Sequence, residues 1–168
     1  RASGPVGEGG RHAAGPFRGD AWTGGAGTQQ VERTLGPAKY HDRLPWFAEV
    51  NDDGTVRIEG ARAGVMEREI EFAAEAGLDY WAFLLYPESS PMSVGLRQYL
   101  ESPERHRLEF CLILHCTLKS PEDAWQRERD RALALLKEDG YRTVLAERPL
   151  VYAFAGGDFP FERFVEFT

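Results

Sequence analysis

Residues 65–88 combine the pattern of an amphipathic helix with that of a buried strand. Small or apolar residues recur there at helical spacing, with charged residues between them, and the apolar positions are Met66, Ile70, Ala73, Ala74 and Gly77. We expect the helix to end at Gly77, because glycine readily adopts the left-handed backbone that closes a helix. The following run, residues 78–86, carries one charge, at Asp79. A strand that is apolar on both faces is typical of a parallel sheet covered by helices, so the segment predicts one helix-to-strand step of a β/α fold.

Two later segments also predict strands. Residues 108–114 are almost wholly apolar, and residues 141–154 contain two short β segments that we expect to bend at 147–149. With helices between them, the strands follow the order β, α, β, α, β. This order predicts a parallel sheet joined by right-handed crossovers.

Helices are expected between these strands and at the end of the chain. Residues 93–102 favour a short helix, and the tail at 161–167 begins another. The best-defined helix covers residues 122–139. Ser120 stands at its N-cap position and Pro121 at its first helical position, where a missing backbone N–H costs little.

Two arrangements fit this pattern, a doubly wound sheet and part of a barrel. A complete (β/α)8 barrel needs upwards of about 200 residues, more than the 168 of this chain, so we predict an α/β fold in the form of a partial TIM-type barrel with parallel strands. Residues 1–39 are rich in glycine and proline and lack apolar periodicity, and we expect a flexible or irregular lead there, before the partial barrel at 40–168. Within the lead, residues 17–27 are either a flexible linker or a loop that folds over a site.

Composition and charge narrow the classes of function. With 42% apolar and 12% aromatic residues, the chain is expected to be globular. A net charge of −7 and a pI near 5.2 argue against nucleic-acid and anionic-membrane surfaces, which need clustered Lys and Arg. No apolar run approaches the roughly 20 residues of a membrane span. The N-terminus lacks the apolar region of a signal peptide, but the compartment stays open because a signal can lie upstream of Arg1.

The sequence lacks the motifs of metal sites, of nucleotide-binding loops and of serine nucleophiles. The four histidines are dispersed, and Cys111 and Cys116 form no C-x-x-C pair, so we expect buried thiols, no metal site and no cofactor. The glycine-rich phosphate-binding motifs of nucleotide folds do not occur, and neither does the G-x-S-x-G turn of a serine nucleophile.

Four motifs in residues 42–154 together resemble a known family. They are RLP at 43–45, VMEREIEFAAEAGLDYWAFLLY at 65–86, LEFCLIL at 108–114 and DGYRTVLAERPLVYAF at 139–154. In combination they are similar to the WbsX-type, glycoside hydrolase family 99-like domain that is found in polysaccharide and lipopolysaccharide gene clusters. The resemblance implies a (β/α)8 barrel that acts on glycans, of which this chain would hold roughly the first half.

The chain departs from the family pattern at two places. The first apolar strand is missing, and only the Asp-x-Trp part of the loop that follows it is present, within residues 15–22. After the strand at 108–114 the family commonly shows a tryptophan and an Asn-Glu pair, whereas this chain has His115, Cys116 and Thr117. These departures favour the alternative of a non-catalytic or degenerate barrel.

Two carboxylates follow the expected strands. Glycosidases need a pair of carboxyl groups around the scissile bond, one as the acid and one as the base or nucleophile. Glu88 comes just after the strand at 78–86, and Asp158 follows the last strand. We therefore name Glu88 and Asp158 as candidate catalytic residues; the alternative is that both are solvated loop acids.

Aromatic and histidine side chains supply the candidate sugar-binding residues. Tyr86, Trp22 and Trp46 can stack on the C–H face of a sugar, although aromatic residues more often belong to a core. His115 directly follows a strand and can hydrogen-bond a sugar hydroxyl, or it can be structural. His41 beside the RLP motif can line the same site, or it can belong to a turn.

The leading hypothesis is a carbohydrate-active protein, a glycoside hydrolase family 99-like domain that cleaves or processes a polysaccharide as part of a longer enzyme. The rival hypotheses are a non-catalytic carbohydrate-binding or degenerate barrel, and a WbsX-type glycosyltransferase. The expected partner is a polysaccharide or oligosaccharide in each case. A partial barrel leaves a sheet edge open, so self-association through that edge is also expected.

Overall fold

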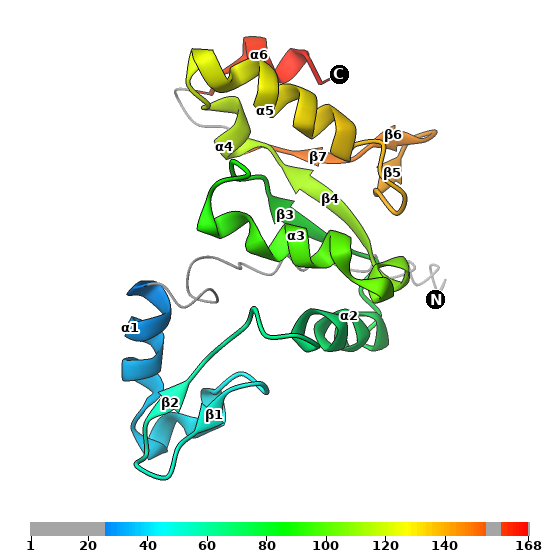
Figure 1. The fold of residues 1–168 in the computed structure, drawn as a ribbon. Coiled ribbons are helices and arrows are strands. Elements are labelled where there is room, and N and C mark those ends of the chain that lie inside the picture. Colours follow the sequence, from blue (N-terminus) through cyan, green and yellow to red (C-terminus); the bar gives the residue numbers. More distant parts are fainter. Residues whose placement is uncertain (1–25, 154–158, 168) are drawn as a thin grey trace, which may run out of the picture.

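The N-terminal part of the chain forms a small unit of its own (Figure 1). The computed structural model describes residues 26–153 and 159–167. The unit holds two helices and an antiparallel hairpin, which are helix α1 (Ala26–Leu35), the 3-10 helix η2 (Ala38–Arg43), β1 (Glu49–Val50) and β2 (Val56–Arg57).

Helix α1 lies where the sequence predicted a flexible or irregular lead. Val31 and Leu35 are one helical turn apart and pack against a small cluster whose buried members are Phe47, Val56, Ile58 and Val65. The carboxylate of Glu32 also accepts the backbone N–H of Ile58 at 2.7 Å. The helix is therefore stabilised by a hairpin that comes later in the chain, and a local pattern with so few apolar positions does not reveal it.

The central sheet is parallel, as the sequence predicted. Its three strands are ordered β3-β4-β7, with bounds β3 (Tyr80–Leu84), β4 (Glu109–Ile113) and β7 (Val151–Tyr152). The register pairs Leu84 with Ile113 and Ile113 with Tyr152, so the strands end together. The chain thus has a mixed α/β fold with parallel strands in one sheet, and closure into a barrel stays a prediction.

The four predicted helices are present around this sheet. They are α2 (Val65–Glu75), α3 (Val94–Glu101), α5 (Glu122–Leu135), which ends before the predicted residue 139, and α6 (Phe161–Val165). The sequence did not predict the short helices η3 (Pro91–Ser93), η4 (Pro103–Arg107) and α4 (His115–Leu118). Gly77 has a φ of 80° after α2, which is the left-handed turn expected there. Among the described residues, none of the helices combines the length and the apolar character that crossing a bilayer requires.

The start of α5 differs from the prediction. Pro121 takes the N-cap position, and no side chain in the described part of the chain caps the helix. The hydroxyl of Ser120, the predicted cap, is buried and has no hydrogen-bond partner among the described residues. Its backbone carbonyl instead accepts a hydrogen bond from Arg163 of α6, which also contacts the ring of Trp125. A contact from the end of the chain therefore sets the conformation of this turn.

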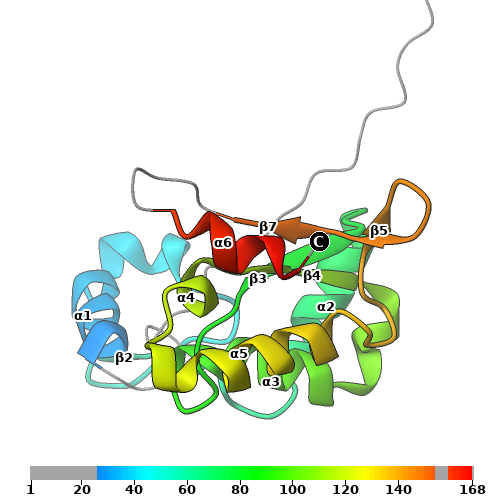
Figure 2. The ribbon, with the colours of Figure 1, turned by 90° about the horizontal axis from the view of Figure 1, so that it is seen from above.

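One face of the sheet is covered by helices. Both crossovers advance in the same direction across the sheet, so α3 and α5 lie on the same side (Figures 1 and 2). Alternate residues of β3 and the chain just after it point toward these helices and are buried, namely Trp81, Phe83 and Leu85. From β4 and the residue that follows it, the buried residues on this side are Phe110, Leu112 and Leu114.

The opposite face of the sheet carries a pair of tyrosines. The hydroxyls of Tyr80 and Tyr152 meet at 2.9 Å, across Ala82 and Cys111, which share this face by alternation. The hydrogen bond with Tyr152 raises the pKa of Tyr80 to about 12. Cys111 is fully buried beneath the pair, as predicted, and burial raises the pKa of its thiol to about 12. The Cys116 side chain lies outside the described residues.

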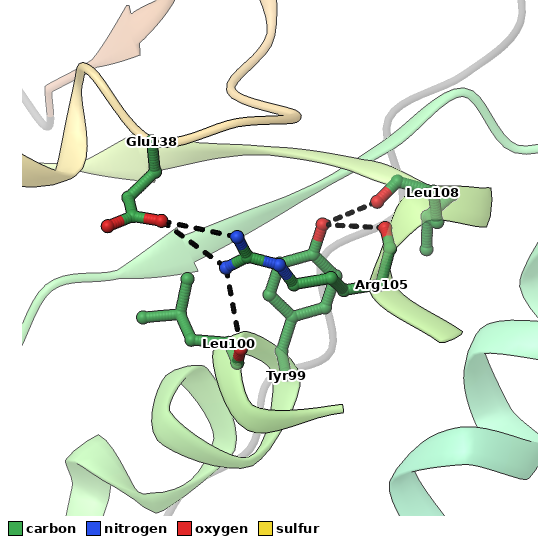
Figure 3. Close-up of polar contacts among 5 residues, drawn as sticks. All are labelled: Tyr99, Leu100, Arg105, Leu108 and Glu138. Atoms are coloured by element: carbon green, nitrogen blue, oxygen red, sulfur yellow. Dashed lines mark hydrogen bonds and ion pairs between the residues drawn. The ribbon is translucent and has the colours of Figure 1, made fainter. Parts of the chain in front are cut away.

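Polar contacts tie the amino edge of the sheet together (Figure 3). The buried Tyr99 of α3 places its hydroxyl within hydrogen-bond distance of the carbonyl oxygens of Arg105 and Leu108. The guanidinium of Arg105 contacts the Glu138 carboxylate at 3.3 Å and the Leu100 carbonyl at 3.4 Å. These contacts join α3, η4 and the turn that follows α5 at the edge opposite to the one where β/α proteins build their sites.

A strained hairpin precedes β7. The sequence predicted two short segments bent at 147–149, and the structure has β5 (Thr143–Val144), β6 (Arg148–Pro149) and then β7. The turn of the hairpin holds three successive non-glycine residues with positive φ, which are Leu145 at 47°, Ala146 at 63° and Glu147 at 67°. A left-handed backbone is costly for residues with a side chain, so this turn is held by the pairing on either side.

We expect Ala146→Gly to raise the free energy of unfolding by about 0.5–1 kcal/mol, because glycine removes the clash of the Cβ in the left-handed region. Urea denaturation would measure the change. Ala134→Gly, on the exposed side of α5, is the matched control and should lower stability instead. A loss of stability at both positions would show that the turn is not strained.

Candidate binding site at the carboxyl edge of the sheet

The carboxyl ends of the three strands meet at one edge. The Leu85 N–H donates to the Ile113 carbonyl at 3.0 Å, and the Leu114 N–H donates to the Tyr152 carbonyl at 3.0 Å. The backbones of β3 and β4 thus leave the sheet at neighbouring points. Tyr86 follows the first of these strands and His115 the second, where it begins α4, and both side chains are half-buried. This edge is where ligand sites form in parallel β/α sheets.

The β3 exit loop, residues 85–90, is fixed by side chains from other elements. Arg131 of α5 donates to the Tyr86 carbonyl at 2.7 Å, and Thr117 of α4 donates to the Leu85 carbonyl at 3.2 Å. Within the segment that follows, the Ser93 hydroxyl lies 3.0 Å from the Glu88 carbonyl. The side chain of Glu88 is exposed. The loop therefore presents Tyr86 and Glu88 from an ordered backbone.

A buried carboxylate lies behind this loop. Glu128 of α5 is 4% exposed, and its Oε2 atom lies 3.5 Å from Nη1 of Arg131. Its other carboxylate oxygen is 3.7 Å from Nε of Arg127. The Oε2 atom has no hydrogen-bond donor among the described residues, so the ion pair with Arg131 is its main compensation for burial.

Glu128 and Arg131 were not among the site residues predicted from the sequence. The signal was present, because Glu128 follows Trp125 by three positions and precedes Ala132 by four, so it lies on the buried stripe of α5. A charged residue in such a stripe indicates a buried ion pair. Which group pairs with it depends on the packing of α5 against the β3 exit loop, and the sequence does not give that packing.

The predicted site residues separate into three groups. Tyr86, Glu88 and His115 lie at the carboxyl edge, as their positions after β3 and β4 predicted. His41 and Trp46 belong to the N-terminal unit, which lies at the lower left of Figure 1, below the sheet. Trp22 and Asp158 lie outside the described residues.

His41 and Trp46 have structural contacts in the N-terminal unit and are not brought to the carboxyl edge. Nε2 of His41 is 2.9 Å from the Gly36 carbonyl, which ties η2 to the end of α1. Trp46 is 50% exposed, and its ring meets Phe72 of α2 edge-on, with 5.8 Å between ring centroids. The expectation that they line the same site does not fit this placement, because the hairpin β1-β2 folds back on α1 and not on the sheet.

A shallow hollow lies between α1 and the β1-β2 hairpin. Its lining residues are Gln29, Glu32, Arg33, Gly36, Gly54, Thr55 and Val56. Glu32 already accepts the Ile58 N–H, and Arg33 already donates to Gln30 at 3.1 Å. The two charged residues that line the hollow, Glu32 and Arg33, thus already have partners within the N-terminal unit. The carboxyl edge of the sheet is therefore the better candidate site.

Comparison of the chain with protein-family models, with curated proteins and with solved structures finds no match. Within the residues that the structure describes, no three His, Cys, Asp or Glu side chains gather in a way that would hold a metal ion. The residues at the carboxyl edge and the motifs of the sequence are therefore the observations that bear on function.

Proposed function

We propose that this chain binds a polysaccharide or oligosaccharide at the carboxyl edge of its sheet. The observation that carries the proposal is the gathering of Tyr86, Glu88 and His115 where β3 and β4 end. A tyrosine ring packs on the C–H face of a sugar, while a carboxylate and an imidazole hydrogen-bond its hydroxyls. A net charge of −7 fits a neutral glycan better than a polyanion.

We further propose that the sheet is a sector of a (β/α)8 barrel of the glycoside hydrolase family 99-like type. Parallel strands joined by crossovers with their helices on one side are the arrangement that such a sector requires. The resemblance of residues 42–154 to that family supports the same assignment.

Binding is better supported than hydrolysis. A glycosidase needs two carboxyl groups around the bond, and the stretches 85–90 and 114–120 contain Glu88 as their single carboxylate. The other candidate, Asp158, lies outside the described residues. Hydrolysis is therefore proposed only with Asp158, or a carboxylate from a longer chain, as the partner of Glu88.

We expect Tyr86→Ala and His115→Ala each to weaken glycan binding by about tenfold or more, because each removes a direct contact with the sugar. A printed array of defined oligosaccharides would identify a ligand for the whole chain, and titration calorimetry with that ligand would measure affinity. Trp46→Ala is the control, since Trp46 lies in the N-terminal unit and should leave affinity unchanged. Loss of binding in Trp46→Ala alone would move the site to that unit.

We also propose that the chain self-associates through the outer edge of β3. Within the described residues β3 pairs with β4 alone, and the edge has no charged residue between Tyr80 and Leu84. We expect light scattering to give a mass above the 18.9 kDa of one chain, and Leu84→Lys to return it to that value. Leu145→Lys, at an 82% exposed position of the β5-β6 turn, should have no such effect. A wild-type chain that is monomeric at all concentrations would contradict this proposal.

A further inference from the structure

Several backbone carbonyls of the β3 exit loop lie within hydrogen-bond distance of side-chain donors. The donors are Thr117 for Leu85, Arg131 for Tyr86, and the Ser93 hydroxyl, which lies 3.0 Å from the Glu88 carbonyl and 2.8 Å from the Ser90 carbonyl. Thr117 is 1% exposed and Ser93 is 5% exposed, so water has little access to either hydroxyl. The donors come from α4, α5 and η3, which surround the loop.

These bonds begin where the hydrogen bonding of the sheet ends. Leu85 donates its N–H to β4 after the end of β3, and the carbonyls beyond it pair with no strand among the described residues. Loop carbonyls in such a position usually bond to water. Here protein side chains replace the water and hold the loop against the body of the fold.

Arg131 is itself oriented by a second group. The buried Glu128 lies one helical turn before it on α5, with 3.5 Å between Oε2 and Nη1. The same Nη1 atom donates to the Tyr86 carbonyl at 2.7 Å. A chain of contacts thus runs from a buried carboxylate through a guanidinium to the backbone of the proposed sugar-stacking residue.

We infer that Thr117, Arg131 and Ser93 are positioning residues that hold the β3 exit loop in a preformed, ligand-ready conformation. None of them needs to touch the ligand. An ordered loop loses little conformational entropy when a ligand binds. Less of the free energy that Tyr86 and Glu88 gain from contacting the ligand is therefore lost to ordering the loop, and the affinity is higher. The role in glycan binding rests on the proposed function, whereas the ordering of the loop does not.

Hydrogen exchange tests the ordering without any ligand. The Ser90 N–H donates to the Pro87 carbonyl and the Ser93 N–H to the Ser90 carbonyl, so their exchange rates report on the loop. We expect Thr117→Val in the whole chain to speed exchange at these two amides about tenfold, the effect of losing one buried hydrogen bond. Exchange at the Leu112 amide in β4 should stay unchanged.

Two variants separate positioning from general destabilisation. Thr117→Ser keeps a hydroxyl and should restore slow exchange at Ser90 and Ser93. Thr143→Val makes the same chemical change at an exposed position of β5 and should alter neither amide. Equal acceleration at Ser90, Ser93 and Leu112 in Thr117→Val, or no acceleration at all, would overturn the ordering role.

Affinity for the glycan found on the array provides the second readout. We expect Thr117→Val to weaken binding severalfold and Thr117→Ser to restore it. Faster loop exchange with unchanged affinity would overturn the positioning role in binding while leaving the ordering intact. If the wild-type chain binds no glycan, the proposed function fails, and the exchange data still decide whether these side chains order the loop.

Discussion

Phe110→Ala is expected to lower the free energy of unfolding by about 3–5 kcal/mol, the range for removing a fully buried aromatic ring. Phe110 lies in the middle of β4 and is 0% exposed. Its ring centroid is 5.3 Å from that of Tyr99 in α3 and 5.0 Å from that of Tyr141, which follows α5. The cavity left by the ring would thus open on the helix-covered face of the sheet, between the rings of Tyr99 and Tyr141.

The Phe110→Ala change should also weaken the hydrogen bonds of Tyr141. Its hydroxyl accepts the Leu112 N–H at 3.1 Å and donates to the Leu150 carbonyl at 2.8 Å, which joins β4 to the chain entering β7. A ring that moves into the cavity would strain both bonds. Urea denaturation followed by tryptophan fluorescence would measure the change.

Phe161→Ala is the matched control for Phe110→Ala. Phe161 is 64% exposed at the start of α6, so the same change in chemistry should cost less than about 0.5 kcal/mol. A similar loss at both positions would mean that the parallel sheet is not the centre of the core.

The helix-to-strand step at 65–86 was predictable because its information is local. The apolar residues of α2 follow a helical period, Gly77 supplies the left-handed turn, and β3 is an uninterrupted apolar run. The site residues Tyr86, Glu88 and His115 follow from the same reasoning, since a residue just after a parallel strand must lie at the carboxyl edge.

Other features depend on partners far away in the sequence. Helix α1 is stabilised by the β1-β2 hairpin, and the turn at Ser120 is set by Arg163, 43 positions later. The hydrogen bond from Arg131 to the Tyr86 carbonyl, which holds the β3 exit loop, is also a long-range contact, because Arg131 lies 45 positions beyond Tyr86. No local pattern encodes these contacts, and so the sequence predicted the loop without the groups that hold it.

The second large effect is expected from Arg131→Met. This change leaves the Glu128 carboxylate, which is 4% exposed, without the cation that compensates for its burial. A fully buried pair broken in this way costs about 3–5 kcal/mol, and the Arg131 side chain is 23% exposed, so we expect a loss of about 2–3 kcal/mol in the free energy of unfolding. Removing a surface charge such as Arg97 should cost little by comparison.

The double variant Arg131→Met with Glu128→Leu separates the cost of an unpaired charge from the loss of the contact with the loop. Two apolar side chains of similar size can replace a buried ion pair at little cost, so we expect the double variant to recover most of the stability lost in Arg131→Met.

The hydrogen bond to the Tyr86 carbonyl is absent in both variants. The β3 exit loop should therefore stay loose in the double variant, with fast exchange at the Ser90 amide despite restored global stability. A double variant that is no more stable than Arg131→Met would show that the pair contributes through packing and not through charge, and slow exchange at Ser90 would show that Arg131 does not hold the loop.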